Sequence, residues 1–257
     1  PSGTAGVLGG SETSYNLTAG SAAVEVSPNE NVNFTEPCMV ASTINEGQYM
    51  NQNKSFENFV IGESNKLAFE AAKKVSEKIA HYNPFYLYAG VGMGKTHLLN
   101  SIGLSLKEKN KVMFISAERF MYHFIRSIKN HDMVKFKDFF RAADIFIIDD
   151  IQFFQGKEQT QEHYFHLFNS LYQNGKQIIL TSDKHPNQMS GFKERLISRF
   201  QSGLVIDIQP PDLETKVAIL KKKAEAESVP LPDNVALHIA EKIKSNVREL
   251  EGSLIRL

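Results

Sequence analysis

The chain has 257 residues, of which 42% are apolar and 23% charged, a composition typical of an ordinary globular protein. Its 29 basic and 29 acidic side chains leave no net charge, and no apolar run approaches the ~20 residues of a membrane-spanning helix. Because Cys38 is the only cysteine and no HExxH pair occurs, the sequence predicts neither an internal disulfide nor a structural metal site. No basic and apolar leader of a signal peptide is evident, so we expect a cytoplasmic protein.

Residues 1–53 differ from the rest of the chain in charge. They contain five acidic side chains and no Lys or Arg, so the remainder carries a small positive excess. Such an excess permits contact with nucleic acid without requiring it. Because the segment is rich in Ser, Thr, Gly and Asn and has few large apolar residues, it is predicted to be a flexible acidic linker or tail. A short β segment through Val24 and Val26 is the alternative.

The chain from residue 54 onward alternates between helical and strand-like patterns. Apolar residues at three- and four-residue spacing predict a helix over residues 67–81. Five short apolar runs follow, at residues 85–88, 112–115, 145–148, 177–180 and 204–208. The third run is apolar without alternation, which is typical of a strand covered on both faces of a parallel sheet. The order predicts an α/β fold over residues 54–211, a five-stranded parallel sheet in an αβα sandwich.

The sequence after Pro210-Pro211 has only helical patterns. They cover residues 214–227, residues 233–244, and residue 246 onward. This shift predicts a small helical lid over residues 212–257 that is incomplete at its C-terminus.

A glycine-rich loop follows the first expected strand and leads into a helix over residues 98–106. Glycines let backbone amides close around an anion, and the helix N-terminus adds its dipole. Lys95 would reach the β- and γ-phosphates and the Thr96 hydroxyl would bind Mg²⁺. The usual phosphate loop begins with Gly where this chain has Ala89, but this position ends a strand, so we expect ordinary backbone dihedrals there. The predicted ATP or ADP contacts are Gly90, Val91, Gly92, Met93, Gly94, Lys95, Thr96 and His97. A glycine-rich turn with a surface lysine is the alternative.

Acidic residues end the third and fourth expected strands. Asp149 and Asp150 follow the third, at the edge where open α/β sheets bind ligands. Asp149 would hold Mg²⁺ together with Thr96, and Asp150 would orient or activate the attacking water. Asp183 ends the fourth strand, where it would contact water around the γ-phosphate or cap a turn before Pro186.

Seven sequence blocks together resemble one family. They are NFVIGESN, GVGMGKTHLL, FIIDDIQFF, ILTSDKHP, ERLISRF, IQPPDLETKVAIL and SNVRELEG, in this order. Over residues 54–257 they resemble the AAA+ ATPase domain of the DnaA family of bacterial replication initiators. Asp150 stands where many AAA+ motors carry Glu, and its shorter carboxylate predicts slow hydrolysis suited to a switch.

The resemblance implies roles for residues that composition alone leaves as surface positions. Phe59 and the predicted nucleotide contacts Val60, Ile61, Gly62 and Asn65 would lie against adenine and ribose. Arg199 would be an arginine finger that completes the ATP site of an adjacent subunit, with Arg195 as a further interface candidate. Arg248 would reach from the lid to the phosphates of its own subunit.

Residues 117–143 are longer than a simple crossover and predict two helices broken near residues 130–132. The resemblance implies that this insertion makes each subunit a wedge, so that ATP-bound copies form an open head-to-tail filament. It also implies a contact with single-stranded DNA through Ile125, Arg126 and Lys129. Gln159 stands where the family often has Arg, which weakens that expectation. Alternatively, Ile125 belongs with Phe124 to the core side of an amphipathic helix.

The function implied by the resemblance is an ATP-dependent initiator of chromosomal replication. It would bind ATP and Mg²⁺, assemble on origin DNA near the nucleoid, promote unwinding and be reset by hydrolysis, with the replicative helicase and regulators as further partners. The family recognises duplex DNA with a C-terminal helix-turn-helix domain. Because the sequence ends at Leu257 within the expected lid, we expect a fragment and assign it no duplex recognition. The alternatives are a regulatory paralogue of the Hda type, a helicase loader of the DnaC type, and a nucleotide-binding scaffold that does not hydrolyse.

Overall fold

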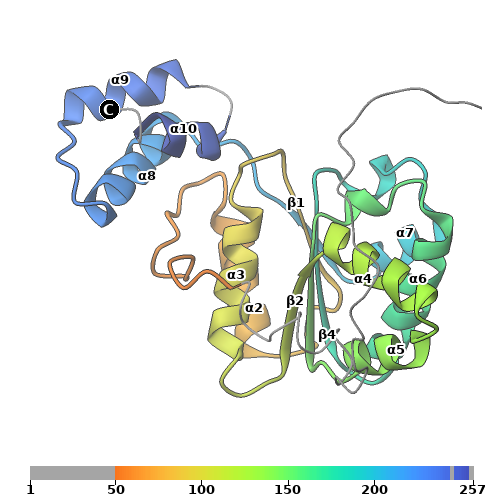
Figure 1. Ribbon diagram of the computed structural model, residues 1–257. Coiled ribbons are helices and arrows are strands. Elements are labelled where there is room, and N and C mark those ends of the chain that lie inside the picture. The colour runs from red at the N-terminus through yellow and green to blue at the C-terminus, as the bar shows by residue number, and fades with distance from the viewer. Residues whose placement is uncertain (1–49, 244–245, 255–257) are drawn as a thin grey trace, which may run out of the picture. The chain divides into compact units, whose positions relative to one another are not determined.

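The computed structural model describes residues 50–243 and 246–254, all within the compact unit Pro37–Leu257 (Figure 1). Most of the expected tail therefore lies outside the described residues. Its last residues belong to the base, because Met50 is buried and the Asn51 N–H donates to Asn100 Oδ1 at 2.7 Å. The base thus includes Met50 rather than beginning at Lys54.

The centre of the base is a five-stranded sheet in the order β2-β3-β4-β1-β5, with every neighbouring pair parallel. The strands are β1 (Phe85–Tyr88), β2 (Val112–Ser116), β3 (Ile145–Asp149), β4 (Gln177–Ser182) and β5 (Leu204–Asp207). Strands β3 and β4 are buried along their whole length. The predicted α/β fold and its five strands are confirmed, because central strands covered on both faces read as continuous apolar runs.

Helices cover both faces of this sheet (Figure 1). One face packs against α2 (Lys66–Glu77) and α3 (Lys95–Leu106). The other packs against α4 (Ala117–Lys129), α5 (Met133–Arg141), α6 (Glu158–Gln173) and α7 (Glu194–Gln201), with the short 3₁₀ turns η1 (Ile151–Phe154) and η2 (Pro186–Gln188). This second core is rich in aromatic rings, which contribute large buried areas and edge-to-face contacts.

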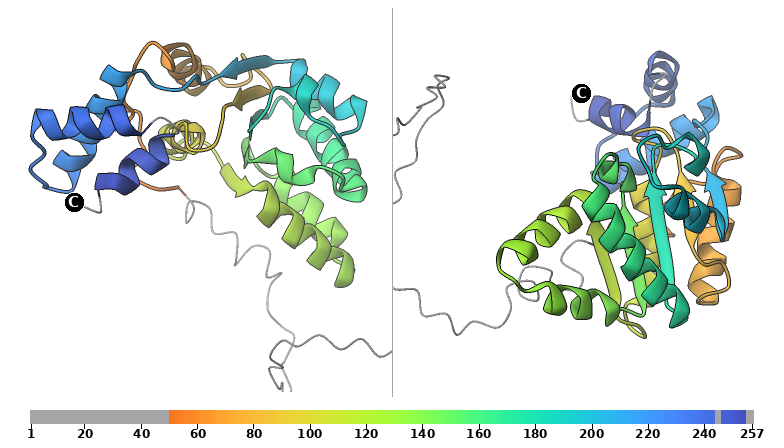
Figure 2. Two further views of the ribbon diagram at one scale, coloured as in Figure 1. Left: turned by 90° about the horizontal axis from the view of Figure 1, so that it is seen from above. Right: turned by 90° about the vertical axis from the view of Figure 1, so that its right-hand side faces the viewer.

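The predicted insertion consists of α4 and α5, which break at Asn130–Asp132 as the sequence indicates. His131 lies in the left-handed region with φ 57°, which ends α4. Figure 2 shows the two helices as a hairpin beside the β2 edge of the sheet.

The segment after β5 folds into α8 (Leu213–Ala226), α9 (Asp233–Lys242) and α10 (Val247–Leu254). These three helices share a small apolar core of Leu220, Ala224, Ala240, Leu250 and Leu254. The side chain of Asp212 begins α8 by accepting a hydrogen bond from the Thr215 N–H at 2.7 Å. We refer to these helices as the lid. Among the described residues, no helix combines the length and apolar character needed to cross a membrane.

Candidate nucleotide-binding site

The loop between β1 and α3 has the backbone geometry of an anion cradle. Gly92 and Gly94 have φ values of +73° and +98°, and Gly94 is the N-cap of α3. Only glycine adopts these values without strain. Ala89 has no positive φ, and its N–H continues the sheet by donating to Ser182 O at 3.2 Å. The alanine therefore costs the loop nothing, in agreement with the ordinary dihedrals expected at a strand end.

Lys95 lies inside this loop, with only 7% of its surface exposed. Its Nζ donates to Ala89 O at 2.8 Å and to Gly90 O at 3.1 Å. Burial lowers the pKa of Lys95, and the nearby carboxylates of Asp150, Asp149 and Asp183 oppose that shift. The surface-lysine alternative is thus wrong, because the ammonium group is enclosed at the carboxyl edge of the sheet.

Arg248 also acts on Lys95, and its positive charge lowers the pKa of the lysine further. Arg248 is exposed in the first turn of α10. Next to it, the Val247 N–H donates to Gly92 O at 3.0 Å. The lid therefore touches the tip of the loop directly and carries a guanidinium group to it.

Asp149 is a buried carboxylate held by two hydroxyl groups. Thr96 Oγ1 donates to Asp149 Oδ2 at 2.8 Å, and the Thr181 hydroxyl donates a short hydrogen bond to Asp149 Oδ1. Burial raises the pKa of Asp149. A buried carboxylate adjacent to a threonine hydroxyl offers the hard oxygen ligands that Mg²⁺ prefers, so Thr96 and Asp149 fit the predicted ion.

The substitution Asp149→Asn is expected to raise the free energy of unfolding at pH 7.5 without Mg²⁺, because it removes the cost of burying a charged carboxylate. A carboxyl group whose pKa is raised in the folded state stabilises the protein at low pH and loses that contribution as pH rises. The advantage of the Asn variant should therefore shrink as pH falls towards 5. Urea unfolding at both pH values measures it, with Asp138→Asn on the exposed side of α5 as the control. An equal advantage at both pH values would contradict a buried, charged Asp149.

Asp150 follows Asp149 in a left-handed conformation, with φ 60° and ψ 52°. Its N–H donates to Thr181 Oγ1 at 2.9 Å, and its Oδ1 accepts from Gln152 Nε2 at 3.0 Å. Thr181 therefore joins both acids, a role that the sequence did not assign although the residue stands in the polar end of β4. The strained backbone turns Asp150 away from the direction of the strand, as is common at functional sites.

Asp183 does not cap the turn before Pro186. The 3₁₀ turn η2 begins at Pro186, and its N-cap is His185, whose Nδ1 accepts from the Asn187 N–H at 3.2 Å. Asp183 instead lies close enough to Lys95 to affect its pKa. The turn-capping alternative for Asp183 is wrong, because the imidazole takes that position.

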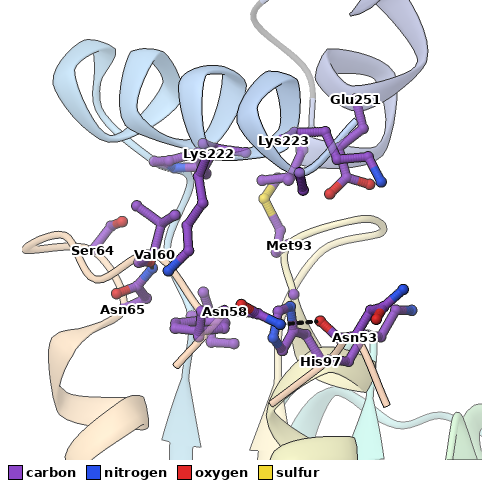
Figure 3. A pocket seen from close by; sticks show the side chains of 18 of the residues that line it. Asn53, Asn58, Val60, Ser64, Asn65, Met93, His97, Lys222, Lys223 and Glu251 are labelled. Atoms are coloured by element: carbon purple, nitrogen blue, oxygen red, sulfur yellow. Dashed lines mark hydrogen bonds between the residues drawn. The ribbon is translucent and has the colours of Figure 1, made fainter. Parts of the chain in front are cut away.

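A cavity of about 450 Å³ extends from the loop to the lid, within the size range of small-molecule sites (Figure 3). The base contributes Phe59, Val60, Asn65, Met93, Gly94 and His97, and the lid and the segment before it contribute Ile208, Ile219 and Lys222. Figure 3 shows Lys222 reaching down from α8 between the two parts. Its Nζ donates to Glu57 O. The lid residues were missed because only their apolar helical spacing is visible in the sequence.

Among the predicted nucleotide contacts, Ile61 lies outside the cavity, Gly62 permits a close helix contact, and Asn65 lines the cavity and also braces its own loop. Ile61 is 48% exposed and does not line the cavity. A Cβ at Gly62 would lie 2.0 Å from Thr215 Oγ1, so this glycine allows close approach of α8. Asn65 holds the loop together, because it accepts from the Gly62 N–H and donates to Val60 O. We therefore expect adenine to contact the backbone of this segment and the side chain of Val60.

His97 faces the cavity rather than the phosphate loop. Its Nε2 is 2.9 Å from Ser55 O, and its ring lies edge-on to Phe59 at 5.1 Å. Burial lowers the pKa of His97, so the imidazole is neutral at pH 7. A neutral ring beside Phe59 suits a flat base better than a phosphate.

Comparison with known proteins agrees with this geometry. The family model of the bacterial DnaA ATPase domain matches residues 50–207. The chromosomal replication initiator proteins DnaA of Citrifermentans bemidjiense and Geobacter sulfurreducens are each 53% identical to the chain over 81% of its length. The chain belongs to the DnaA family. It spans about half the length of these relatives, 46% and 48% respectively.

Solved DnaA structures share the fold. Domain III of the Thermotoga maritima protein is 42% identical with a TM-score of 0.79, covering 81% of this chain and 88% of that chain. DnaA of Aquifex aeolicus bound to AMPPCP is 38% identical with a TM-score of 0.75, covering 81% and 65%. A replication initiator DnaA bound to AMPPCP and single-stranded DNA is 38% identical with a TM-score of 0.76 and the same coverage.

The arginine that resembles the DnaA finger lies away from the phosphate loop of its own chain. Arg199 is half-exposed on α7, and its guanidinium group is 6.0 Å from the ring centroid of Tyr172 on α6. Both helices pack on the sheet face opposite α3. Arg195, in contrast, is paired with Glu162 and lies 4.5 Å over the ring of Phe165. Arg199 is therefore better placed than Arg195 to reach another molecule.

The structure separates the two apolar residues that the sequence grouped in the insertion. Phe124 is 1% exposed and belongs to the core, whereas Ile125 is 47% exposed. Lys129 is exposed one turn further along α4, and Arg126 is half-buried between them. Tyr122, 60% exposed on the same side of α4, was missed because an isolated aromatic residue in a helical pattern usually indicates core.

Proposed function

We propose that the chain is the ATP-binding and ATP-hydrolysing part of a bacterial replication initiator and acts as a nucleotide-dependent switch. The observation that carries this proposal is the hydrogen bond from Thr96 to the buried Asp149 beside Lys95, at the end of a glycine-rich loop that also lines a cavity shared by the base and the lid. Membership of the DnaA family and relatives named as initiators favour this function over an Hda-type paralogue or a helicase loader.

Each group at the carboxyl edge of the sheet has a defined part in this proposal. Lys95 and the loop amides bind the β- and γ-phosphates, and Thr96 and Asp149 hold Mg²⁺. The ion would supply neutralisation of charge on the phosphates. Asp150 orients the attacking water, and Asp183 contacts that water from the neighbouring strand. Arg248 brings the lid to the phosphates, so nucleotide binding favours one lid position.

Assembly of subunits follows from the position of Arg199. A guanidinium group offered to the ATP site of a second copy makes a head-to-tail contact whose strength depends on the γ-phosphate. Such a contact uses two different surfaces and need not close, so it produces an open filament. The α4–α5 hairpin beside β2 would act as the wedge between copies.

Single-stranded DNA is the second proposed ligand, and Ile125, Arg126 and Lys129 are the proposed contacts. They lie along one side of α4 and combine apolar and basic groups, as single-strand surfaces do. The solved relative described as bound to single-stranded DNA supports this. Origin DNA, the replicative helicase and regulators would then be partners of the full protein in the bacterial cytoplasm, near the nucleoid.

Nucleotide-dependent sedimentation of the full chain tests the switch. We expect larger species with ATP and Mg²⁺ than with ADP, and a further increase when single-stranded DNA is added. Turnover of ATP is measured in the same samples and should be slow, because the short Asp150 carboxylate holds water less closely. Identical profiles with the two nucleotides would contradict the switch, and absent turnover would favour a non-hydrolysing scaffold.

Tyr122→Ala is expected to weaken binding of single-stranded DNA about 5- to 100-fold, the range that loss of one base–aromatic stack produces. The reason is that Tyr122 exposes its ring one turn before Ile125. Fluorescence anisotropy with a labelled oligonucleotide measures the affinity. Val134→Ala is a matched control, since Val134 is 72% exposed on the neighbouring α5. Equal affinities of wild type and the Tyr122 variant for the oligonucleotide would contradict a stacking contact between Tyr122 and a base.

A further inference from the structure

Gln161, near the start of α6, is a buried polar residue beside the aromatic core on this face of the sheet. Only 1% of its surface is exposed, and it lies on the same side of α6 as Tyr164 and Phe168. A buried amide is costly unless each of its groups is paired, so its hydrogen bonds indicate why it is there.

The amide of Gln161 joins two segments that are distant in sequence. Its Nε2 donates to Phe154 O and to Gly191 O, both at 2.8 Å, and its Oε1 accepts from the Lys193 N–H at 3.0 Å. Phe154 ends the turn η1, which begins directly after Asp150. Lys193 is the N-cap residue of α7, the helix that carries Arg199.

The start of α7 depends on these bonds for its direction. Lys193 has no side-chain cap of its own in α7, and Gly191 turns the chain with φ +73°. The Gly191 carbonyl accepts from both Gln161 Nε2 and the Gly156 N–H, at 2.8 and 3.1 Å. Other polar contacts near this end include the partly exposed ion pairs of Lys193 and Arg195 with Glu162, which stabilise little. Further along α7, Leu196 and Phe200 are completely buried and hold the body of the helix against the core.

The acidic turn at the other end has further anchors. The Asp150 N–H donates to Thr181 Oγ1 and its carboxylate accepts from Gln152 Nε2, and neither bond involves Gln161. Loss of the Gln161 amide should therefore disturb the start of α7 more than it disturbs Asp150.

We propose that Gln161 is a positioning residue that fixes the orientation of α7, and with it the guanidinium group of Arg199, relative to the acidic turn of the same subunit. The proposal rests on the function proposed above, in which Arg199 completes the ATP site of another subunit. Gln161 then has no contact with nucleotide but decides whether the donated arginine reaches it.

The test mixes two full-chain variants so that only one kind of ATP site can work. Subunits with Arg199→Ala keep a complete site but donate no finger, and subunits with Asp150→Asn donate a finger but do not hydrolyse. ATP turnover of the mixture reports the finger of the second subunit in the site of the first. Gln161→Met, which keeps the length of the side chain but removes its hydrogen bonds, is added to one partner at a time.

Gln161→Met in the finger donor should lower the complemented turnover at least tenfold, because small displacements of a catalytic group have large effects on rate. The same substitution in the site-bearing partner should change turnover less than threefold, which also shows that the variant folds and assembles. Gln173→Met, exposed on the last turn of α6, should have no effect in either partner.

Two results would overturn the inference, and they differ from each other. If complementation fails when Gln161 is intact, Arg199 is not a donated finger and the proposed assembly fails together with the inference. If complementation works but the Gln161 variant has equal effects in both partners, or none, the assembly stands and Gln161 is only a packing residue.

Discussion

Lys95→Ala should weaken binding of ATP by at least about 100-fold, close to the 3 kcal/mol that a charge-assisted hydrogen bond to phosphate contributes. The ammonium group is enclosed by the loop, and three carboxylates of the same sheet edge surround it. Without it, a triphosphate would meet those carboxylates unscreened. Isothermal titration calorimetry measures the affinity of the full chain for ATP.

The control for this experiment is Lys107→Ala. Lys107 is the C-cap residue of the same helix, α3, and its side chain is exposed. Its loss should leave ATP affinity within about twofold, because Lys107 lies at the end of α3 opposite the phosphate loop and its exposed charge is screened by salt. Thermal unfolding of both variants separates lost binding from lost folding. If a folded Lys95 variant binds ATP with unchanged affinity, this loop is not the nucleotide-binding site.

Arg199→Ala should lower ATP turnover of the assembled protein by at least about 100-fold, because arginine fingers contribute a factor of 10³ or more in related reactions. Binding of ATP to the dilute, unassembled chain should not change, since Arg199 lies beside Tyr172 on the sheet face away from α3. Turnover as a function of protein concentration, with calorimetry at low concentration, distinguishes the two effects.

Arg195→Ala is the matched control on the same helix. Its guanidinium group already contacts Glu162 and the Phe165 ring, so its removal should lower turnover less than threefold. If turnover falls more in the Arg195 variant than in the Arg199 variant, the finger is Arg195 and the assignment to Arg199 is wrong. Loss of ATP affinity in the dilute Arg199 variant would instead place that residue in its own subunit's site.

The strands of the sheet and the polar residues at their carboxyl ends could be predicted from the sequence, because both depend on local patterns. A buried parallel strand such as β3 is a continuous apolar run, and the phosphate loop needs glycines at fixed spacing before a helix. Both the loop after β1 and the acids after β3 lie at the carboxyl edge of a parallel sheet, and the structure brings Asp149 against Thr96 there. The resemblance to the DnaA family came from seven sequence blocks in combination, of which the phosphate loop is only one.

Side-chain partners were less predictable because they depend on residues far away in the chain. Asn65 matches a nucleotide-binding motif, yet its amide binds its own loop. Phe124 and Ile125 are neighbours in an amphipathic helix, and only packing of Phe124 against Phe136 of α5 and His163 of α6 decides which of them is buried. Thr181 joins Asp149 to Asp150 because β4 lies beside β3.

What the sequence by itself determined is therefore the order of strands and helices, the phosphate loop and the acids that face it, since short-range periodicity and backbone conformation specify them. Only the tertiary structure decided how the lid closes the cavity, which side of the insertion is exposed, and how Gln161 connects the acidic turn to α7. These depend on hydrogen bonds and packing between segments that no local pattern relates.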